Sequence, residues 1–525
     1  MIIGAGKETK TLESKIITGE EFEKLREKIK ADDKTIVMCH GVYDLLHYGH
    51  IEHLQEAKNY GDIVVVSVTS APYVNKGPDR PYFDDRQRTR FLASIEFVDY
   101  VMLSNEPTAI TNIRHIQPDI YVKGQEFESG TDGVTGQVAD EIAEVEKFGG
   151  TVRYTQGEVY SSSKLLNNYF GSLPEGVPEF SRSLLAKYGD DLFNQIEKMV
   201  DDFENLKVLV VGDIIIDEYI FCRPQGLTSK DTVISTRFQS DEKYLGGALA
   251  IARHVANFVP NAEFLTMMGV EEGLRDRIEK RMPKGMKLHI LTDKNFVTPV
   301  KRRYLKIHPQ RKDNEKLFSV NFLNEEENIR ETDYKKFHDA LEKMIADYDL
   351  VIVCDYGHGL IDREAIDIIE KNSKYLSVNC QTNSSNYGMN VITKYGRADA
   401  FALDEKELKL AFREYSEDYN AQLRKLKEAL KAQIGWLTVG AEGAICTNND
   451  ETVKAPALTL RVTDTVGAGD AFFAISSLCA VENIPADIAT LLSNAAGAMK
   501  THVVGNKSSV KKKDFLKFIK TVLNV

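Results

Sequence analysis

Cysteine is scarce in this sequence. The 525 residues include six cysteines, and no two of them form a C-x-x-C pair. Such scattered cysteines suggest neither a zinc site nor a disulfide framework. They are typical of a protein in a reducing compartment, so we expect a cytoplasmic location.

Long apolar runs are also missing. No run reaches the roughly 18 residues that would suggest a membrane-spanning helix. The first residues, MIIGAGKETKTLESK, have no apolar core followed by a small-residue cleavage site, so they do not resemble a secretory signal. We therefore expect no membrane partner.

Positive charge is not in excess. Lys and Arg number 67 against 79 Asp and Glu, which gives a formal net charge of -12. A nucleic-acid-binding surface needs clustered basic residues, so we expect no nucleic-acid partner. Small anionic ligands remain possible, because a local basic pocket can exist on an acidic protein.

The length predicts two to four domains at roughly 150 residues each. In the N-terminal third, short apolar runs alternate with helix-like stretches, which predicts a parallel sheet covered by helices. These runs lie at residues 35–38, 63–68, 98–103 and 119–123. One helix is expected over residues 51–60, with Gly61 as its C-cap.

A boundary is expected near residues 171–180, where GSLPEGVPEF contains two prolines and two glycines. We predict one domain over 1–170, a linker and helix over 171–205, and a second α/β domain over 206–525. In the second domain, 219–245 and 297–323 alternate polar with β-branched and aromatic residues. These two segments predict antiparallel strands that form a small lid.

The segment GVYDLLHYGH, Gly41 to His50, follows an apolar strand and opens a helix. A helix N-terminus supplies N–H donors that stabilise crowded phosphates. His47 and His50 share one helical turn, so both imidazoles can reach one triphosphate, and Gly41 permits close approach of the backbone. Two surface histidines or a metal-binding pair are the alternatives, but the strand-turn-helix context favours phosphate binding.

This segment resembles the H-x-G-H nucleotidyltransferase family, which includes glycerol-phosphate cytidylyltransferases and the adenylyltransferase half of bacterial heptose kinase/adenylyltransferases. The likeness extends over roughly residues 14–170, through 76–101, 118–128 and SSSKLL at 161–166. It implies a Rossmann-like domain in which particular side chains face the triphosphate. These are Lys76, Lys123, Ser161, Ser162 and Ser163. Taken alone, the lysines could be solvated and the serines a plain helix cap.

A second motif, DTVGAGDAFF at 464–473, leads into an apolar helix. Phosphoryl transfer to an alcohol needs donors around the γ-phosphoryl group and a base beside the hydroxyl. Gly467, Ala468 and Gly469 can expose consecutive N–H groups as an anion hole, and Asp470 can take the hydroxyl proton. A helix cap would explain Asp470 alone, but hardly the whole string.

This string is similar to the signature of the ribokinase-like carbohydrate kinases, and the likeness covers roughly 206–515. It implies an α/β/α fold in which Asp217, Gly246 and Gly247 meet the substrate. Thr438 and Gly440 in LTVGAEGA, and Asn494 in SNAAGA, would border the nucleotide.

The resemblance also implies that Glu407 orients Mg²⁺ through water, although Asp404 replaces the Asn usual in that element. Other positions depart further from the heptose kinases. Ala250 stands where a substrate-binding Asn is common, His358 replaces Lys, and Asn379–Cys380–Gln381 replaces Asp-Pro-Lys. The base is retained but the acceptor pocket differs, which argues against heptose 7-phosphate as the acceptor.

Together the motifs predict a bifunctional enzyme whose domain order is reversed relative to the heptose enzyme. The kinase would phosphorylate a sugar or sugar phosphate with ATP and Mg²⁺. The transferase would move a nucleotidyl group from ATP or CTP to the sugar phosphate and release pyrophosphate. The resemblance to the ribokinase-like carbohydrate kinases also implies a homodimer formed through the lid. The alternatives are a non-sugar phosphate ester as acceptor of the transferase, a kinase of unrelated specificity, and a catalytically silent kinase half that only binds or dimerises.

Overall fold

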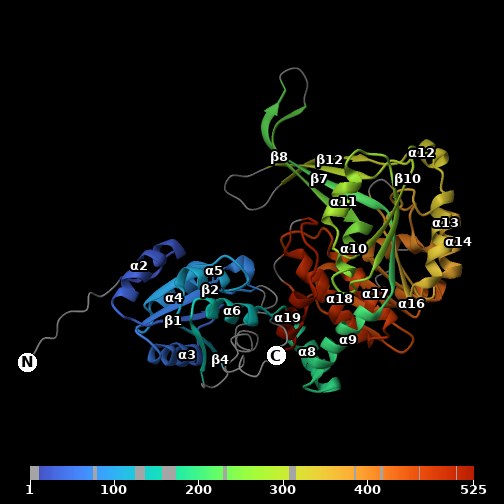
Figure 1. Cartoon of the computed structure of the whole chain (residues 1–525). Helices are drawn as coiled ribbons and strands as arrows, with labels where there is room; N and C mark the ends of the chain where they lie inside the picture. Colours follow the sequence, from blue (N-terminus) through green and yellow to red (C-terminus); the bar gives the residue numbers. More distant parts are fainter. Residues whose placement is uncertain are drawn as a thin grey trace, which may run out of the picture. The chain divides into compact units, whose positions relative to one another are not determined.

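The computed structural model describes residues 11–74, 80–124, 136–155, 173–228, 233–306, 315–383, 386–413, 418–459, 462–503 and 505–524. The chain forms two compact units (Figure 1). The N-terminal unit consists of Met1–Leu173 and Leu516–Val525, and the C-terminal unit is Pro174–Phe515.

The N-terminal unit contains a five-stranded parallel sheet in the order β3-β2-β1-β4-β5. The strands are β1 (Ile36–Gly41), β2 (Ile63–Thr69), β3 (Tyr100–Ser104), β4 (Ile120–Gly124) and β5 (Thr151–Thr155), and the helices between them include α3 (Tyr48–Asn59), α4 (Asp85–Ala93), α5 (Ile110–Ile116) and α6 (Gly136–Lys147). The predicted strands are confirmed. The strand order reverses at β1, and in open α/β sheets ligands bind beyond the carboxyl ends of the strands at such a point.

Gly61 has a different role from the predicted one. Helix α3 has its C-cap at Tyr60, and the φ angle of Gly61 is not in the left-handed region. A Cβ at this position would lie 2.7 Å from Val37 Cγ2 and 3.0 Å from the Thr35 carbonyl oxygen. The glycine therefore permits close approach to the start of β1 rather than a left-handed helix end.

The C-terminal unit is built on a nine-stranded sheet in the order β10-β9-β6-β13-β14-β15-β16-β17-β18. Seven strands run parallel, and β17 and β18 add an antiparallel edge. The strands are β6 (Val208–Gly212), β9 (Glu263–Met268), β10 (Lys287–Thr292), β13 (Leu350–Asp355), β14 (Leu376–Cys380), β15 (Ala400–Asp404), β16 (Ile434–Thr438), β17 (Ala444–Thr447) and β18 (Thr452–Ala455).

Helices cover this sheet on both sides (Figure 1). Helices α17 (Ala468–Val481) and α18 (Ala486–Thr501) are buried on nearly every face, and they pack together with α10 (Ala248–Val255). A second apolar cluster joins the sheet to α13 (Lys335–Met344), α14 (Arg363–Asn372) and α16 (Tyr419–Ala429). The predicted α/β/α arrangement is confirmed.

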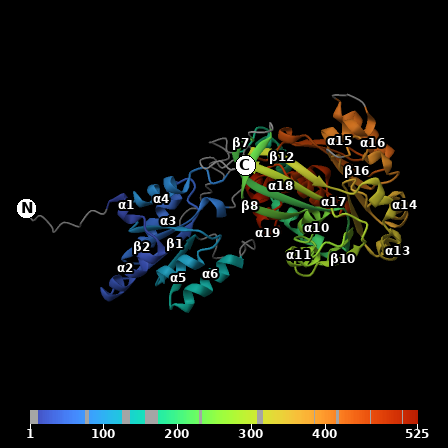
Figure 2. The ribbon, with the colours of Figure 1, turned by 90° about the horizontal axis from the view of Figure 1, so that it is seen from above.

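The two lid segments form a separate four-stranded sheet in the order β12-β11-β7-β8. Its strands are β7 (Ile214–Leu227), β8 (Ile234–Gly247), β11 (Val300–Lys306) and β12 (Glu315–Phe322), and β7, β8 and β12 are labelled in Figure 2. The pairs β7–β8 and β11–β12 are antiparallel as expected, but β11 pairs with β7 in parallel. The alternation of polar and apolar residues within a segment predicts the two strands of that segment. How one strand pair joins the other depends on the tertiary structure.

In the described residues, no helix combines the length and the apolar character needed to cross a bilayer.

Candidate active sites

In the C-terminal unit, a cavity of about 250 Å³ adjoins the N-terminus of α17. Gly467 is the N-cap of this helix and has a φ of +81°, a left-handed conformation that favours glycine. Ala468 and Gly469 begin the helix, where backbone N–H groups have no intrahelical acceptor, and the Ala468 N–H donates to the Thr465 carbonyl oxygen at 3.2 Å. Gly467, Gly469 and Asp470 all line the cavity. The predicted anion hole and base therefore share one space.

Asp470 is held by two side chains from other elements. Its Oδ1 accepts hydrogen bonds from the Tyr356 hydroxyl at 2.9 Å and from Gln381 Nε2 at 3.2 Å. Desolvation raises the pKa of the Asp470 carboxyl, while these two bonds act in the opposite direction. The carboxylate is thus oriented toward the cavity as a proton acceptor must be.

The lid sheet supplies the opposite wall of this cavity. Asp217 on β7 is buried, forms an ion pair with Arg303, and accepts a bond from Asn506 Nδ2 at 3.3 Å. Gly246 lies against it, since a Cβ there would meet Asp217 Oδ2 at 2.2 Å. Lys301 is the cross-strand neighbour of Asp217 and also lines the cavity. Desolvation lowers the pKa of the Lys301 ammonium, and Asp217 opposes that shift.

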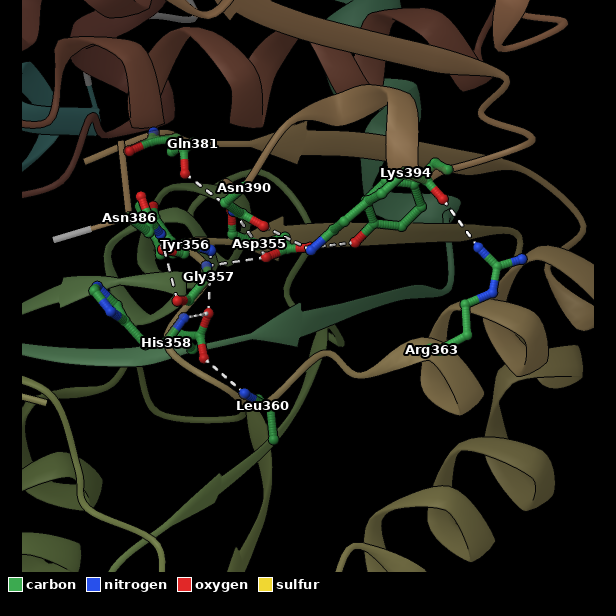
Figure 3. Close-up of polar contacts among 12 residues, drawn as sticks. Asp355, Tyr356, Gly357, His358, Leu360, Arg363, Gln381, Asn386, Asn390 and Lys394 are labelled. Atoms are coloured by element: carbon green, nitrogen blue, oxygen red, sulfur yellow. Dashed lines mark hydrogen bonds and ion pairs between the residues drawn. The ribbon is translucent and has the colours of Figure 1, made fainter. Parts of the chain in front are cut away.

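The loop after β13 carries Tyr356 and is fixed by two buried carboxylates, and Figure 3 shows one of them, Asp355, which accepts the Gly357 N–H at 3.0 Å. Asp213 accepts backbone N–H bonds from Tyr356 at 3.0 Å and Leu360 at 3.3 Å. Asp355 accepts from the Tyr395 hydroxyl at 2.6 Å and pairs with Lys394 at 2.5 Å. Burial, with the nearby charge of Asp355, raises the pKa of Asp213 to about 7. Sequence reasoning missed this support, because its members come from separate segments.

The residues that differ from the heptose kinases do not all lie at the cavity. Gln381 lines the cavity, whereas Asn379 is buried on β14 and donates to the Ala402 carbonyl at 2.8 Å. Ala250 is buried within α10. His358 is also buried, and desolvation lowers its pKa to about 3, with the charge of Lys301 acting in the same direction. His358 is therefore neutral near pH 7.

A second cavity of about 480 Å³ lies beside the first and shares Thr465 and Gly469 with it. Its walls include Thr438, Gly440 and Asn494, which were predicted to border the nucleotide, and Ala468 and Gly469 of the predicted anion hole. Its apolar walls include Leu458 and Phe472. An elongated ligand could thus occupy both cavities and cross the anion hole between them.

Glu407 is part of a capping box at the start of α15 (Glu405–Phe412). Its Oε2 accepts from the Asp404 N–H at 3.0 Å, and Asp404 Oδ1 accepts from the Glu407 N–H at 2.8 Å. Burial, with the charge of Asp404, raises the pKa of Glu407 to about 8. In the described part of the chain, no cluster of three acidic, His or Cys side chains could hold a metal ion directly. Carboxylate oxygens suit Mg²⁺ held through water, and the role of Glu407 toward this ion stays a prediction.

In the N-terminal unit, His47 and His50 meet at the N-terminus of α3. His47 is the N-cap, and the two imidazole rings stack with centroids 3.9 Å apart. Gly41 ends β1, where a Cβ would lie 3.1 Å from the Tyr43 ring. The H-x-G-H residues therefore gather at the point where the strand order reverses.

Lys123 lies at the end of β4, beside β1, and its ammonium contacts Glu141 Oε2 at 2.8 Å. Both side chains are buried. In this structure the charge of Lys123 is therefore matched by a carboxylate, and its role at a phosphate stays a prediction. Lys76, Ser161, Ser162 and Ser163 lie outside the described residues.

Arg88 is a residue that sequence reasoning missed. It is fully buried and donates to the Val42 carbonyl at 2.6 Å and the Thr69 carbonyl at 2.8 Å. It thereby joins the loop after β1 to the end of β2, both beside the histidines. Arg88 lies in the segment 76–101, which resembles the heptose enzyme, but spacing along the chain does not show which carbonyls an arginine reaches.

Comparison with known families decides what the C-terminal unit is. Residues 205–513, more than half of the chain, match the pfkB family of carbohydrate kinases. The chain belongs to the pfkB carbohydrate kinase family. In this pfkB-family chain, residues 38–168 also match the cytidylyltransferase-like family. The chain is thus an enzyme with a nucleotidyltransferase-like segment before its kinase segment, as predicted.

The curated relatives match a limited part of this pfkB-family chain. The bifunctional protein HldE of Aliarcobacter butzleri is 40% identical over 131 residues, which cover 25% of this chain and 27% of that protein. The HldE of Koribacter versatilis is 36% identical over 157 residues, which cover 29% of this chain and 31% of that protein. Each match spans less than a third of the relative's length. It supports the likeness of the N-terminal unit to HldE.

Solved structures similar to this pfkB-family chain have low sequence identity to it. Phosphofructokinase-2 from Escherichia coli is 13% identical, with a TM-score of 0.48 and coverage of 60% of this chain and 99% of that one. Ribokinase from Arabidopsis thaliana is 15% identical, with a TM-score of 0.46 and the same coverage values.

Proposed function

We propose that the C-terminal unit transfers the γ-phosphoryl group of ATP to a hydroxyl of a sugar or sugar phosphate. The N-terminal unit then transfers a nucleotidyl group from ATP or CTP to the resulting sugar phosphate, releases pyrophosphate and forms a nucleotide-activated sugar. The observation that carries the proposal is the meeting of two cavities at Gly469, with Asp470 beside the junction.

In the kinase reaction, Asp470 accepts the proton of the attacking hydroxyl while that oxygen bonds to the γ-phosphorus and ADP leaves. The N–H groups at Gly467, Ala468 and Gly469 stabilise the negative charge on the transferred group. Mg²⁺, when bound, neutralises phosphate charge, and Glu407 would orient it through water. Tyr356 and Gln381 hold Asp470 in place.

The acceptor binds in the smaller cavity, between the anion hole and the lid. Asp217, next to Gly246 and Gly247, accepts hydrogen bonds from the hydroxyl groups of the acceptor. The same wall contains Lys301 and Arg303, which favour an acceptor that carries an anionic group. Of the positions that depart from the heptose kinases, Gln381 lines this cavity, which supports an acceptor other than heptose 7-phosphate.

In the transferase reaction, the phosphate oxygen of the acceptor attacks the α-phosphorus of the nucleotide and pyrophosphate leaves. His47, His50 and the N-terminus of α3 stabilise the charge on the crowded phosphates. Lys76, Lys123 and the serines at 161–163 would contribute further phosphate contacts. The motif itself is compatible with either ATP or CTP.

Two units in one chain support consecutive steps, since the kinase product would be the transferase substrate. The alternatives are a transferase that acts on a non-sugar phosphate ester, with a kinase of unrelated specificity, and a silent kinase half. The residues at Gly467–Asp470 and their supports favour an active kinase. We also propose a homodimer formed through the lid sheet.

A substrate screen tests the proposal. Sugars, sugar phosphates and polyols are each incubated with the four nucleoside triphosphates and Mg²⁺, and ADP and pyrophosphate are measured separately. We expect one acceptor class to release ADP and its phosphorylated product to release pyrophosphate. Pyrophosphate release with non-sugar esters only would favour the alternative acceptor, and no ADP with any hydroxyl compound would favour the silent module.

A further inference from the structure

The last turn of α18 contains a buried lysine that the mechanism above does not use. Lys500 is only 2% exposed, yet it lies next to the anion hole. Desolvation lowers the pKa of its ammonium, while Asp470 and Asp464 act in the opposite direction. Burying a charge costs free energy unless hydrogen-bond or ion-pair partners compensate for it. The partners of Lys500 therefore indicate its role.

Lys500 and Asp464 both form hydrogen bonds to the backbone of Val466 and Gly505. Lys500 Nζ donates to the carbonyl oxygens of Val466, at 3.3 Å, and of Gly505. Asp464 accepts from the N–H groups of those residues, at 3.1 Å from Val466 and 2.8 Å from Gly505. This four-bond clamp joins the loop before α17 to the loop after α18.

The clamp adjoins the groups that would hold the transferred phosphoryl. Val466 directly precedes Gly467, and a Cβ at Gly467 would lie 3.5 Å from Lys500 Nζ and 2.6 Å from Asn506 Oδ1. The ammonium is therefore behind the N-terminus of α17. The carboxylate of Asp217 also acts to raise the pKa of Lys500, whereas the charge of Arg253 acts to lower that pKa. His254 also faces Lys500, and burial keeps this imidazole neutral near pH 7.

We propose that Lys500 is a positioning residue whose ammonium acts as a built-in monovalent cation. Bound to backbone carbonyls, it holds the anion-hole loop closed and adds positive charge behind the γ-phosphoryl site. Backbone carbonyl oxygens also coordinate free monovalent cations, so an ion such as K⁺ or NH₄⁺ can replace the ammonium when the side chain is shortened. This inference rests on the proposed kinase function.

The test compares Lys500→Ala, which leaves room for an ion, with Lys500→Met, which fills the space without charge. Lys371→Met is the matched control, because it removes an exposed ammonium from α14. ADP formation is measured with the acceptor from the screen in choline chloride, KCl and NH₄Cl. The midpoint of thermal unfolding is measured in the same salts, and this second readout needs no acceptor.

We expect wild type and Lys371→Met to be insensitive to the choice of cation. Both Lys500 variants should lose at least about tenfold in ADP formation, as is common when a preorganised charge is removed. KCl or NH₄Cl should restore the rate of ADP formation and the unfolding midpoint of Lys500→Ala. The same salts should restore neither quantity in Lys500→Met. If wild type forms no ADP, the proposed function fails, and the unfolding midpoints alone decide this inference.

Two results would overturn the inference. One is a rate of ADP formation by Lys500→Met in choline chloride that equals the wild-type rate. This result would show that the ammonium has no part in positioning. The other is an unfolding midpoint of Lys500→Ala that responds equally to choline, K⁺ and NH₄⁺, which would leave Lys500 an ordinary buried residue.

Discussion

At the scale of single residues, Asp470 shows why a motif residue needs its neighbours. It is the third residue of α17, whose N-cap is Gly467, and its Oδ1 accepts from Tyr356 and Gln381. Those partners come from the ends of β13 and β14 rather than from the helix. Its side chain therefore borders the cavity and does not cap the helix, as the proposed role of base requires.

We expect Asp470→Asn to bind ATP but to lose phosphoryl transfer by about 10²–10⁴-fold, because an amide cannot take the hydroxyl proton. ATP binding is measured by calorimetry and turnover by ADP formation with the identified acceptor. Asp367→Asn, on the exposed side of α14, is the control. Turnover close to wild type in Asp470→Asn would contradict the base assignment.

A second residue-scale prediction concerns His254, whose Nδ1 accepts the Val510 N–H at 3.1 Å. Burial lowers the pKa of its imidazole to about 3, with Lys500 acting in the same direction. The unfolded chain takes up the proton near pH 6.5, so stability is full above that pH and falls as pH decreases toward 3. Between pH 6.5 and 5 the loss is about 2 kcal/mol, at about 1.4 kcal/mol per pH unit.

Denaturant unfolding at several pH values measures this effect, followed by the fluorescence of Trp436. This residue is the chain's single tryptophan and is buried in the C-terminal unit. His254→Gln keeps an acceptor for Val510 and should reduce the pH dependence of the unfolding free energy. His115→Gln, in the N-terminal unit, should not. An unchanged pH dependence in His254→Gln would refute the prediction.

At the scale of elements, the lid sheet presents two different faces. Asp217 and Lys301 are cross-strand neighbours on the face toward the acceptor cavity. Because side chains alternate along a strand, Phe318, Val320 and Phe322 of β12 share one face with their neighbours Tyr304, Arg302 and Val300. That face is opposite the cavity, and these three β12 side chains are 40–47% exposed.

An exposed apolar face on an open sheet often marks an interface. We expect the wild-type chain to sediment as a dimer at micromolar concentration, and Val320→Asp to sediment as a monomer, because the carboxylate would be desolvated in the interface. Val270→Asp, at a site 66% exposed in the same unit, is the control. A monomeric wild type would contradict the dimer, although not the lid.

At the scale of the whole molecule, each unit has its own sheet and core. The two proposed sites lie in different units: His47 and His50 precede residue 173, and Asp470 lies within Pro174–Phe515. The chemistry of one site should therefore not require the residues of the other.

We expect His50→Ala to abolish nucleotidyl transfer, measured as pyrophosphate release, while ADP formation changes less than twofold. Asp470→Asn should show the reverse when the sugar phosphate is supplied directly. Loss of both activities in a folded His50→Ala protein would contradict this division.

The sequence alone determined the features that depend on local physics. Apolar runs predicted the parallel strands, and the glycine-rich string at 464–473 predicted a turn into a helix. The histidine spacing placed both imidazoles at one helix terminus. These inferences succeeded because strand burial, glycine conformations and helix periodicity act over a few neighbouring residues.

Only the tertiary structure decided which distant groups meet. It paired β11 with β7 in parallel, placed Glu141 against Lys123, and brought Lys500 to the carbonyls of Val466 and Gly505. It also gave Gly61 a packing role in place of a left-handed cap. No spacing rule reveals such contacts, because a hydrogen bond or ion pair depends on distance in space, and residues far apart in sequence approach only when the sheets and helices have packed.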